Sequence, residues 1–173
     1  MEIFNTNWKV LIPIFKYPTK GLGIREISRL SSVAHPSVLK IINGLAKEGV
    51  VRVEKREKLH LVKGNFENED FLELKRLYNL LSLKELTDFL KERFDPEVII
   101  VLGSYSKGMD FEESDIDIYM GSKKFRINPR DLRKFEERLA RRIDIFTGNL
   151  KGFPDELKEN IINGVKLWGW LKI

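Results

Sequence analysis

The sequence predicts an α+β chain made of two domains, and three observations support this fold class. The front half has the pattern of three short helices and a strand hairpin, whereas the back half alternates strands with helices. Charge divides in the same place: residues 1–64 carry 12 Lys and Arg against 5 Asp and Glu, and residues 65–173 carry 19 against 21. We therefore expect a basic domain over residues 1–66, a helical linker over 67–94 and a second domain over 95–173.

Composition limits the class of protein. Hydrophobic residues make up 42% of the 173 residues, enough for real cores, and no apolar run approaches the roughly 20 residues of a membrane-spanning helix. The N-terminus has no basic start before an apolar stretch, so we expect no signal peptide. The chain has no cysteine, which excludes disulfides and thiolate metal sites. We expect a cytoplasmic protein that does not enter the membrane.

In the front domain, hydrophobic spacing predicts three helices followed by a hairpin. Helices are expected over residues 8–15 and 24–30, and a third begins near Pro36, which suits the first helical position, and stops before Gly49. Residues 50–62, VVRVEKREKLHLV, alternate on both sides of a charged tip, as a hairpin does. Gly21-Leu22-Gly23 follows no strand, so we interpret it as a turn and not as a dinucleotide-binding loop.

This order of elements resembles the winged helix-turn-helix family, and the resemblance implies DNA binding through the third helix and the hairpin. The inward face of that helix is expected to carry Val38, Ile41, Ile42 and Leu45. The expected DNA-binding residues lie on the opposite face and along the hairpin: Ser37, Lys40, Asn43, Lys47, Arg52, Lys55, Arg56 and Lys58. The excess of positive charge favours a polyanionic partner. Two alternatives stay open: a protein-docking module and a merely solvated charged face.

Beyond the front domain, the hydrophobic periodicity is first helical and then that of alternating strands and helices. Residues 69–94 predict two helices, divided by Ser82-Leu83-Lys84-Glu85, which has the pattern of a capping box. EVIIVLG is a short continuous apolar run, typical of a strand covered on both faces. The elements expected after it are an alternating strand in SDIDIYMG, a helix over 129–140, an alternating strand in RRIDIF, a helix over 155–163 and the short apolar tail VKLWGW.

The point where the apolar strand ends carries the most informative motif. Gly103-Ser104 follows the strand directly, and a glycine there allows a sharp turn and a close approach of the backbone to a ligand. Amide groups at such a turn favour a phosphate, with the Ser104 hydroxyl beside them and Gly108 relaxing the far end of the turn. Lys107 is a candidate phosphate contact, although an exposed lysine in a turn is often only solvated.

Three acids follow this turn. Asp115 and Asp117 are two residues apart on a predicted strand, so both side chains leave the same face while Ile116 and Ile118 face a core. Asp144, in Arg142-Ile143-Asp144-Ile145-Phe146, has the same alternation. If the two strands are neighbours, three carboxylates converge beside the phosphate-binding turn, a set of ligands that suits Mg²⁺ and two-metal phosphoryl chemistry. The alternative is an ordinary solvated sheet face.

The stretch GSYSKGMDFEESDIDIYM resembles the signature of the DNA polymerase beta nucleotidyltransferase superfamily, and most closely its minimal nucleotidyltransferases. The resemblance covers roughly residues 95–170 and includes the tail INGVKLWGW, which implies a helix followed by a closing strand. It implies that Gly103 and Ser104 bind a nucleoside triphosphate and that Asp115, Asp117 and Asp144 bind Mg²⁺ or Mn²⁺ and are catalytic. The expected reaction transfers AMP from ATP to an acceptor hydroxyl.

The family also implies partners. Minimal nucleotidyltransferases are often antitoxins paired with small helical toxin proteins, so such a protein is one expected acceptor and a small molecule is another. The competing interpretation is a DNA-binding transcriptional regulator whose second domain only binds a nucleotide or a protein partner. The sequence leaves open the nucleotide, the acceptor, the DNA target and whether the chain forms a homodimer.

Overall fold

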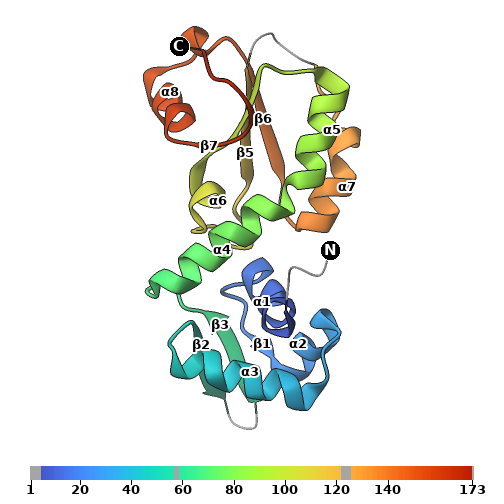
Figure 1. The fold of residues 1–173 in the computed structure, drawn as a ribbon, viewed down its shortest axis with the longest axis vertical. Helices are drawn as coiled ribbons and strands as arrows, with labels where there is room; N and C mark the ends of the chain where they lie inside the picture. The colour runs from blue at the N-terminus through green and yellow to red at the C-terminus, as the bar shows by residue number, and fades with distance from the viewer. Residues whose placement is uncertain (1–4, 57–58, 122–125, 173) are drawn as a thin grey trace. The chain divides into compact units, whose positions relative to one another are not determined.

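The computed structural model describes residues 5–56, 59–121 and 126–172, and of Arg56 and Leu59 the backbone alone. The chain divides into two compact units, Met1–Tyr78 and Asn79–Ile173, which are described separately here (Figure 1). Within the described ranges, every helix is too short or too polar to span a bilayer.

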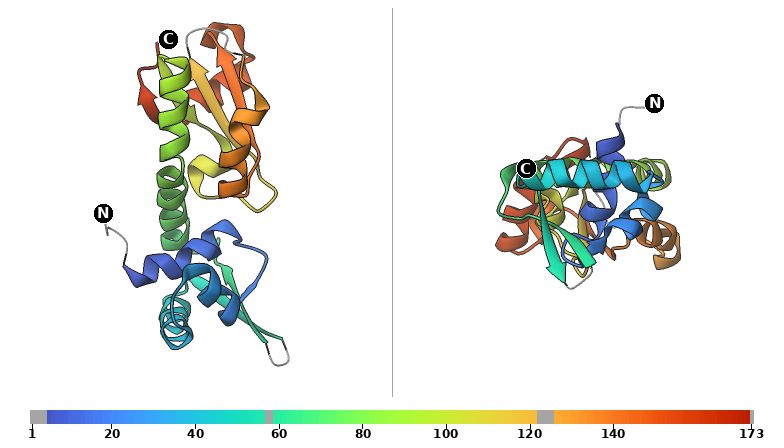
Figure 2. Two further views of the ribbon diagram at one scale, coloured as in Figure 1. Left: turned by 90° about the vertical axis from the view of Figure 1, so that its right-hand side faces the viewer. Right: turned by 90° about the horizontal axis from the view of Figure 1, so that it is seen from below.

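The first unit is a winged helix-turn-helix, as the sequence predicted. Its helices are α1 (Thr6–Lys16), α2 (Ile24–Ser31) and α3 (His35–Lys47), and its strands are β1 (Leu22–Gly23), β2 (Val51–Arg56) and β3 (Leu59–Gly64). The strands form an antiparallel sheet in the order β1-β3-β2. The hairpin of β2 and β3 runs out from the three helices as a two-stranded ribbon (Figure 2).

The helical spacing of the apolar residues explains the core of this unit. On α3, Val38 and Ile42 are buried, and Ile41 and Leu45 pack against the same cluster as partly buried side chains. The opposite face of α3 is therefore left to solvent. One expectation was incomplete: residues 21–23 form more than a turn, because the positive φ of Gly21 directs Leu22–Gly23 against β3 as a third short strand.

The second unit contains a mixed four-stranded sheet with flanking helices. Before the sheet come α4 (Glu69–Ser82), which begins in the first unit, and α5 (Lys84–Phe94). The elements that follow are β4 (Val98–Val101), α6 (Gly103–Lys107), β5 (Ile116–Gly121), α7 (Pro129–Leu139), β6 (Ile143–Gly148), η1 (Leu150–Gly152), α8 (Asp155–Ile162) and β7 (Val165–Gly169).

The sheet has the strand order β6-β5-β4-β7. Strand β4 is antiparallel to both of its neighbours, whereas β5 and β6 are parallel. All four residues of β4 are buried, as a central strand covered on both faces requires. Ile99, Val101, Ile116 and Ile118 pack with α5 and α7 on one face, while Val98, Ile100 and Tyr119 pack with η1 and α8 on the other (Figure 1).

The boundary between α4 and α5 lies where the sequence predicted it, but the expected capping box is absent. Leu83 has helical backbone angles, and no side chain caps α5. The Ser82 hydroxyl instead donates to the carbonyl of Asn79 at 2.6 Å and lies 2.9 Å from the Tyr105 hydroxyl. The predicted role of Ser82 as the cap of α5 is therefore wrong, because its hydroxyl contacts Tyr105 instead.

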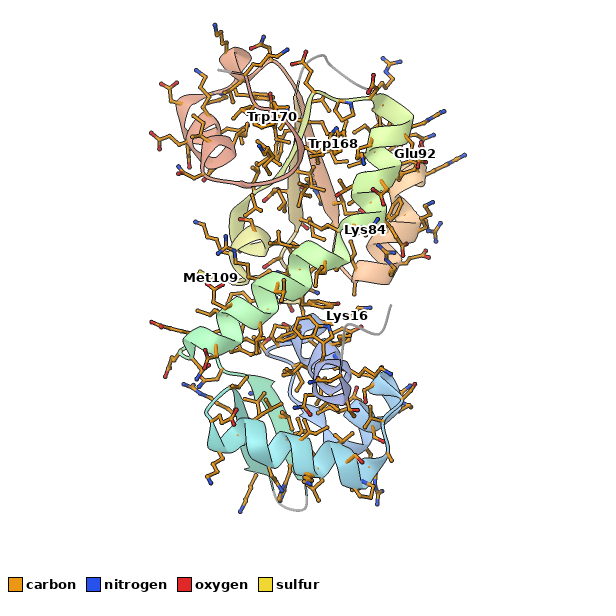
Figure 3. All side chains as sticks on the ribbon, in the orientation of Figure 1. Lys16, Lys84, Glu92, Met109, Trp168 and Trp170 are labelled. Atoms are coloured by element: carbon orange, nitrogen blue, oxygen red, sulfur yellow. The ribbon has the colours of Figure 1, made fainter. Side chains whose placement is uncertain are left out.

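Strand β7 closes the sheet after α8, as the resemblance implied. Its burial alternates, and the side chains of Trp168 and Trp170 remain exposed along this edge (Figure 3). Lys91 places its ammonium 3.9 Å from the Trp168 ring centre and Lys166 lies 4.3 Å from that of Trp170. These aromatic rings are thus partly covered by lysine side chains.

Candidate active site

The predicted phosphate-binding turn lies at the end of β4. Helix α6 begins directly after that strand, and Gly103 has a φ of +63°, a conformation that favours glycine. The Leu102 N–H donates to the Asp117 carbonyl at 2.8 Å, which fixes the turn against β5. A Cβ atom on Gly103 would lie 3.1 Å from Oδ2 of Asp117. The glycine therefore allows the turn and the carboxylate to share one small space.

The rest of the turn is held by contacts within the turn itself. The Ser106 hydroxyl donates to the Gly103 carbonyl at 2.8 Å, and Gly108 ends α6 with a φ of +71°. Ser104 is partly buried beside Gly103, whereas the side chain of Lys107 is exposed. Gly103, Ser104 and Gly108 thus lie in one compact turn, and Lys107 is on its solvent side.

The two parallel strands bring Asp117 and Asp144 together. They are register partners, flanked by the pairs Ile116–Ile143 and Ile118–Ile145. Those isoleucines face the cluster with α5 and α7, so the two aspartates share the opposite face of the sheet. Asp115 lies one residue before β5, not within it as expected, and is partly exposed. The strands β5 and β6 are neighbours, so the condition for the convergence of the acids is met.

The electrostatics of the site follow from this pairing. Burial raises the pKa of Asp117 above its ordinary value, and the negative charges of Asp144 and then of Asp115 raise it further. Asp117 is therefore repelled by both of the other carboxylates. Carboxylate oxygens are the hard donors that Mg²⁺ or Mn²⁺ takes, so the donor set is chemically suited to such a cation.

One cationic side chain at this site was missed in the sequence. Arg142 donates from Nη2 to both Asp144 oxygens at 3.0 Å and from Nε to Oδ1 at 3.3 Å. This contact and the charges of Asp144 and Asp115 raise the pKa of Arg142. Among residues 5–56, 59–121 and 126–172, no three Asp, Glu or His side chains form a coordination group. Arg142 thus occupies both oxygens of Asp144 and competes with a cation for them. The i, i+2 spacing of Arg142 and Asp144 at the start of β6 was the available signal.

A buried polar cluster next to the site was also missed. Asp110 and Arg141 form an ion pair of 3.2 Å whose side chains are 1% and 2% exposed, and Asn79 donates to Asp110 at 2.6 Å. These residues come from α4, from the segment between α6 and β5, and from the residue pair before β6. Their separation along the chain explains why no local pattern indicated them.

The predicted DNA-binding residues of α3 lie on its solvent-exposed face: Ser37, Lys40, Asn43 and Lys47. On the hairpin, Lys55 is exposed, and Arg52 is exposed but forms an ion pair with Glu67. The side chain of Arg56 and all of Lys58 lie outside the described residues. The structure thus leaves a polar and basic face of α3 accessible.

Comparison with known protein families agrees with the fold of the second unit. The family model for polymerase beta nucleotidyltransferases matches residues 84–169, which include Gly103, Ser104 and the three aspartates. No curated protein was found to be significantly similar to the chain.

Solved structures similar to the chain fall into two groups. The first contains a transcription regulator of the Staphylococcus aureus multidrug efflux pump MepA, at 13% identity and a TM-score of 0.41, covering 54% of this chain and 67% of that chain. It also contains Staphylococcus aureus MarR, at 17% identity and a TM-score of 0.38, covering 54% of this chain and 60% of that chain. The second group contains a putative nucleotidyltransferase from Sulfolobus solfataricus, at 23% identity and a TM-score of 0.33, covering 54% of this chain and 83% of that chain.

Proposed function

Residues 84–169 form a nucleotidyltransferase domain of the polymerase beta family, and on this premise we propose that the protein transfers AMP from ATP to an acceptor hydroxyl in a metal-dependent reaction. The observation that carries the proposal is the register pair of Asp117 and Asp144 beside the Gly103 turn. An acidic pair that raises the pKa of one of its members is unfavourable for stability alone.

In this proposal, Asp115, Asp117 and Asp144 hold Mg²⁺ or Mn²⁺, and the Gly103-Ser104 turn receives the triphosphate. Bound divalent ions supply charge neutralisation and Lewis acidity at the reacting phosphate. The acceptor hydroxyl loses its proton to solvent, and its oxygen forms a bond to the α-phosphorus. The bond from the α-phosphorus to the bridging oxygen breaks, and pyrophosphate leaves with that electron pair. Gly103 contributes by leaving room for the phosphate next to Asp117, and Ser104 by offering its hydroxyl.

Label transfer tests this function directly. The protein is incubated with α-labelled ATP, Mg²⁺ and a host extract as the source of acceptors, and label on macromolecules and released pyrophosphate are both measured. We expect wild-type transfer and a loss of more than about 100-fold in Asp117→Asn, because the substitution removes a charge from the metal site. Glu92→Gln, an exposed acid on α5, is the matched control and should keep full activity. Equal activity of Asp117→Asn, or a wild type that neither binds nor consumes any nucleoside triphosphate, contradicts the proposal.

We infer that the first unit binds DNA through the exposed face of α3. The support is the accessible set of Ser37, Lys40, Asn43 and Lys47, together with the 12 Lys and Arg against 5 Asp and Glu over residues 1–64. Basic side chains beside a helix that fits the major groove contact phosphates, and Ser and Asn reach base edges. A regulator that only senses nucleotide would share this DNA binding but would release no pyrophosphate, which separates the two functions.

The family resemblance alone suggests the candidates for the acceptor. A small helical toxin protein is one candidate, and a small molecule is the other. Purified product of the neighbouring reading frame, added to the label-transfer reaction, distinguishes them: label on that protein supports an antitoxin role, whereas label found only on a small molecule excludes it.

A further inference from the structure

The second unit buries an ion pair that the proposed chemistry does not use. Nη2 of Arg141 lies 3.2 Å from Oδ2 of Asp110, and the Asn79 amide donates to Oδ1 of Asp110 at 2.6 Å. All three residues are at most 5% exposed. Their neighbour Met109 points to solvent, so the chain turns inward at Asp110 (Figure 3). A buried ion pair contributes little net stability compared with apolar side chains of the same size. Stability alone therefore does not explain why the pair is buried at this position.

The cluster is joined to the phosphate-binding turn through Tyr105 of α6. Nδ2 of Asn79 also donates to the Tyr105 carbonyl at 2.8 Å. One helical turn along α4, the Ser82 hydroxyl lies 2.9 Å from the Tyr105 hydroxyl. Tyr105 itself is 3% exposed. Helix α4 thus fixes both ends of the tyrosine, and with it the short helix that begins at Gly103.

The same cluster is joined to the strands that carry the acids. Asp110 lies in the segment between Gly108 and Asp115. Arg141 is three residues before Asp144, and the carbonyl of its neighbour Arg142 accepts the Ile116 N–H at 2.8 Å. A displacement of Asp110 or Arg141 would consequently move Asp115 and Asp144 relative to the Gly103 turn.

We propose that Asn79, Asp110 and Arg141 are positioning residues that set the spacing between the nucleotide-binding turn and the three acids. None of them touches the substrate; each acts through the backbone of a segment that carries a site residue. The inference rests on the proposed nucleotidyl transfer for its functional meaning. Its structural content, that these contacts immobilise residues 103–117 and 141–144, can be tested without any substrate.

Two variants test the proposal. Asp110→Leu/Arg141→Met replaces the buried pair with apolar side chains of similar size, which often preserves stability. Asn79→Leu keeps the ion pair but removes the donor to Tyr105 and Asp110. The control is Tyr119→Phe, which deletes a buried hydrogen bond of 2.9 Å to the Gly148 carbonyl at the other end of the same sheet. If the double variant does not fold, Asn79→Leu decides the outcome, because it buries no unpaired charge.

Amide hydrogen exchange and steady-state kinetics are then compared at conditions where each variant is folded. We expect exchange over residues 103–117 and 141–144 to be about tenfold faster in both variants, since an intramolecular hydrogen bond is lost. It should be unchanged over these residues in Tyr119→Phe, whose lost hydrogen bond lies at Gly148. We also expect kcat to fall roughly 100-fold while KM for ATP changes far less, as for groups held slightly out of place.

Wild-type exchange in both variants, or the same acceleration in Tyr119→Phe, would overturn the proposal. A kcat that returns to the wild-type value whenever the melting temperature does would also overturn the proposal, because a purely structural role predicts that result. A wild type without transfer activity defeats the proposed function only, and the exchange comparison still decides whether these residues immobilise the site.

Discussion

Asp117 on β5 and Asp144 on β6 are direct partners in a parallel strand pair, with isoleucine pairs on both sides of them. Because side chains alternate along strands, the isoleucines commit both aspartates to one face of the sheet. The turn at Gly103 then closes over that face, near enough for an added Cβ to contact Asp117. The hydrophobic core on one side thus determines where the charges on the other side accumulate.

The first prediction concerns the stability cost of this arrangement. Burial and the charges of Asp144 and Asp115 raise the pKa of Asp117, so its ionised form destabilises the folded protein at pH values above the raised pKa. Asp117→Asn should therefore raise Tm at neutral pH by about 2–4 °C. The gain should shrink as the pH falls and vanish well below about 4, because the wild-type carboxyl then becomes protonated in both the folded and the unfolded state. Thermal unfolding followed by circular dichroism at several pH values measures this.

Glu92→Gln is the control for that series, since its carboxyl lies on the exposed side of α5. A lower Tm for Asp117→Asn at every pH would mean that the charged carboxylate stabilises the fold, contrary to the sign derived above.

The second prediction concerns Gly103. Gly103→Ala forces a side chain into a backbone conformation with φ of +63° and brings its Cβ to 3.1 Å from Asp117. We expect a loss of about 1–2 kcal/mol in the free energy of unfolding from the backbone strain, together with weaker ATP binding. Urea denaturation measures the first and nucleotide titration the second. Gly152→Ala is the control, because nothing lies within 4 Å of its added Cβ; equal losses in both variants would refute the special role of Gly103.

The third prediction concerns Arg142. Its guanidinium contacts Asp144 in an ion pair that is largely exposed, with 68% of the arginine side chain accessible. Exposed pairs contribute little stability, so their removal changes a competing equilibrium by only a few-fold. We expect Arg142→Ala to tighten Mn²⁺ binding to the nucleotide-free protein by about two- to fivefold.

Arg133→Ala provides the comparison for Arg142→Ala. Arg133 forms an exposed ion pair of 3.0 Å with Glu137 on α7, away from the three aspartates in sequence. It should leave Mn²⁺ affinity unchanged. Weaker Mn²⁺ binding by Arg142→Ala would show that the arginine supports the site and does not compete for it.

The fourth prediction concerns DNA. The logarithm of affinity for a random-sequence duplex should fall linearly with the logarithm of salt concentration, because phosphate contacts release counterions. Lys40→Ala/Lys47→Ala removes two exposed cations from α3 and should reduce the magnitude of the slope by about 2. Fluorescence anisotropy over a range of salt concentrations measures the slope. Lys151→Ala, in η1, should leave it unchanged, and an unchanged slope in the double variant excludes this face of α3.

Much of the fold could be predicted because its signals are local. Alternation in SDIDIYMG and RRIDIF identified the strands β5 and β6 and the inward faces of Ile116, Ile118 and Ile143. Helical spacing on α3 identified the buried Val38 and Ile42. In each case, one side of an element meets a core and the other meets solvent, so the pattern is written within a few residues.

Contacts between distant segments could not be predicted in the same way. The sequence indicated that Asp117 and Asp144 would share a site, but their direct register depends on how two strands align across an intervening helix. The buried group of Asn79, Asp110 and Arg141 spans 31 positions between its first two members alone. Ser82 had a plausible local partner and adopted a tertiary one. Pairing of this kind depends on packing, which no single segment encodes.

The central claim, that the three aspartates form a divalent-cation site completed by nucleotide, is tested most directly by Mn²⁺ titration followed by electron paramagnetic resonance, with and without ATP. We predict that ATP tightens Mn²⁺ binding to the wild type and to Glu92→Gln. The same enhancement should be lost in Asp117→Asn and in Asp144→Asn, because each removes an oxygen donor with its charge. Wild-type enhancement in both aspartate variants would contradict the account.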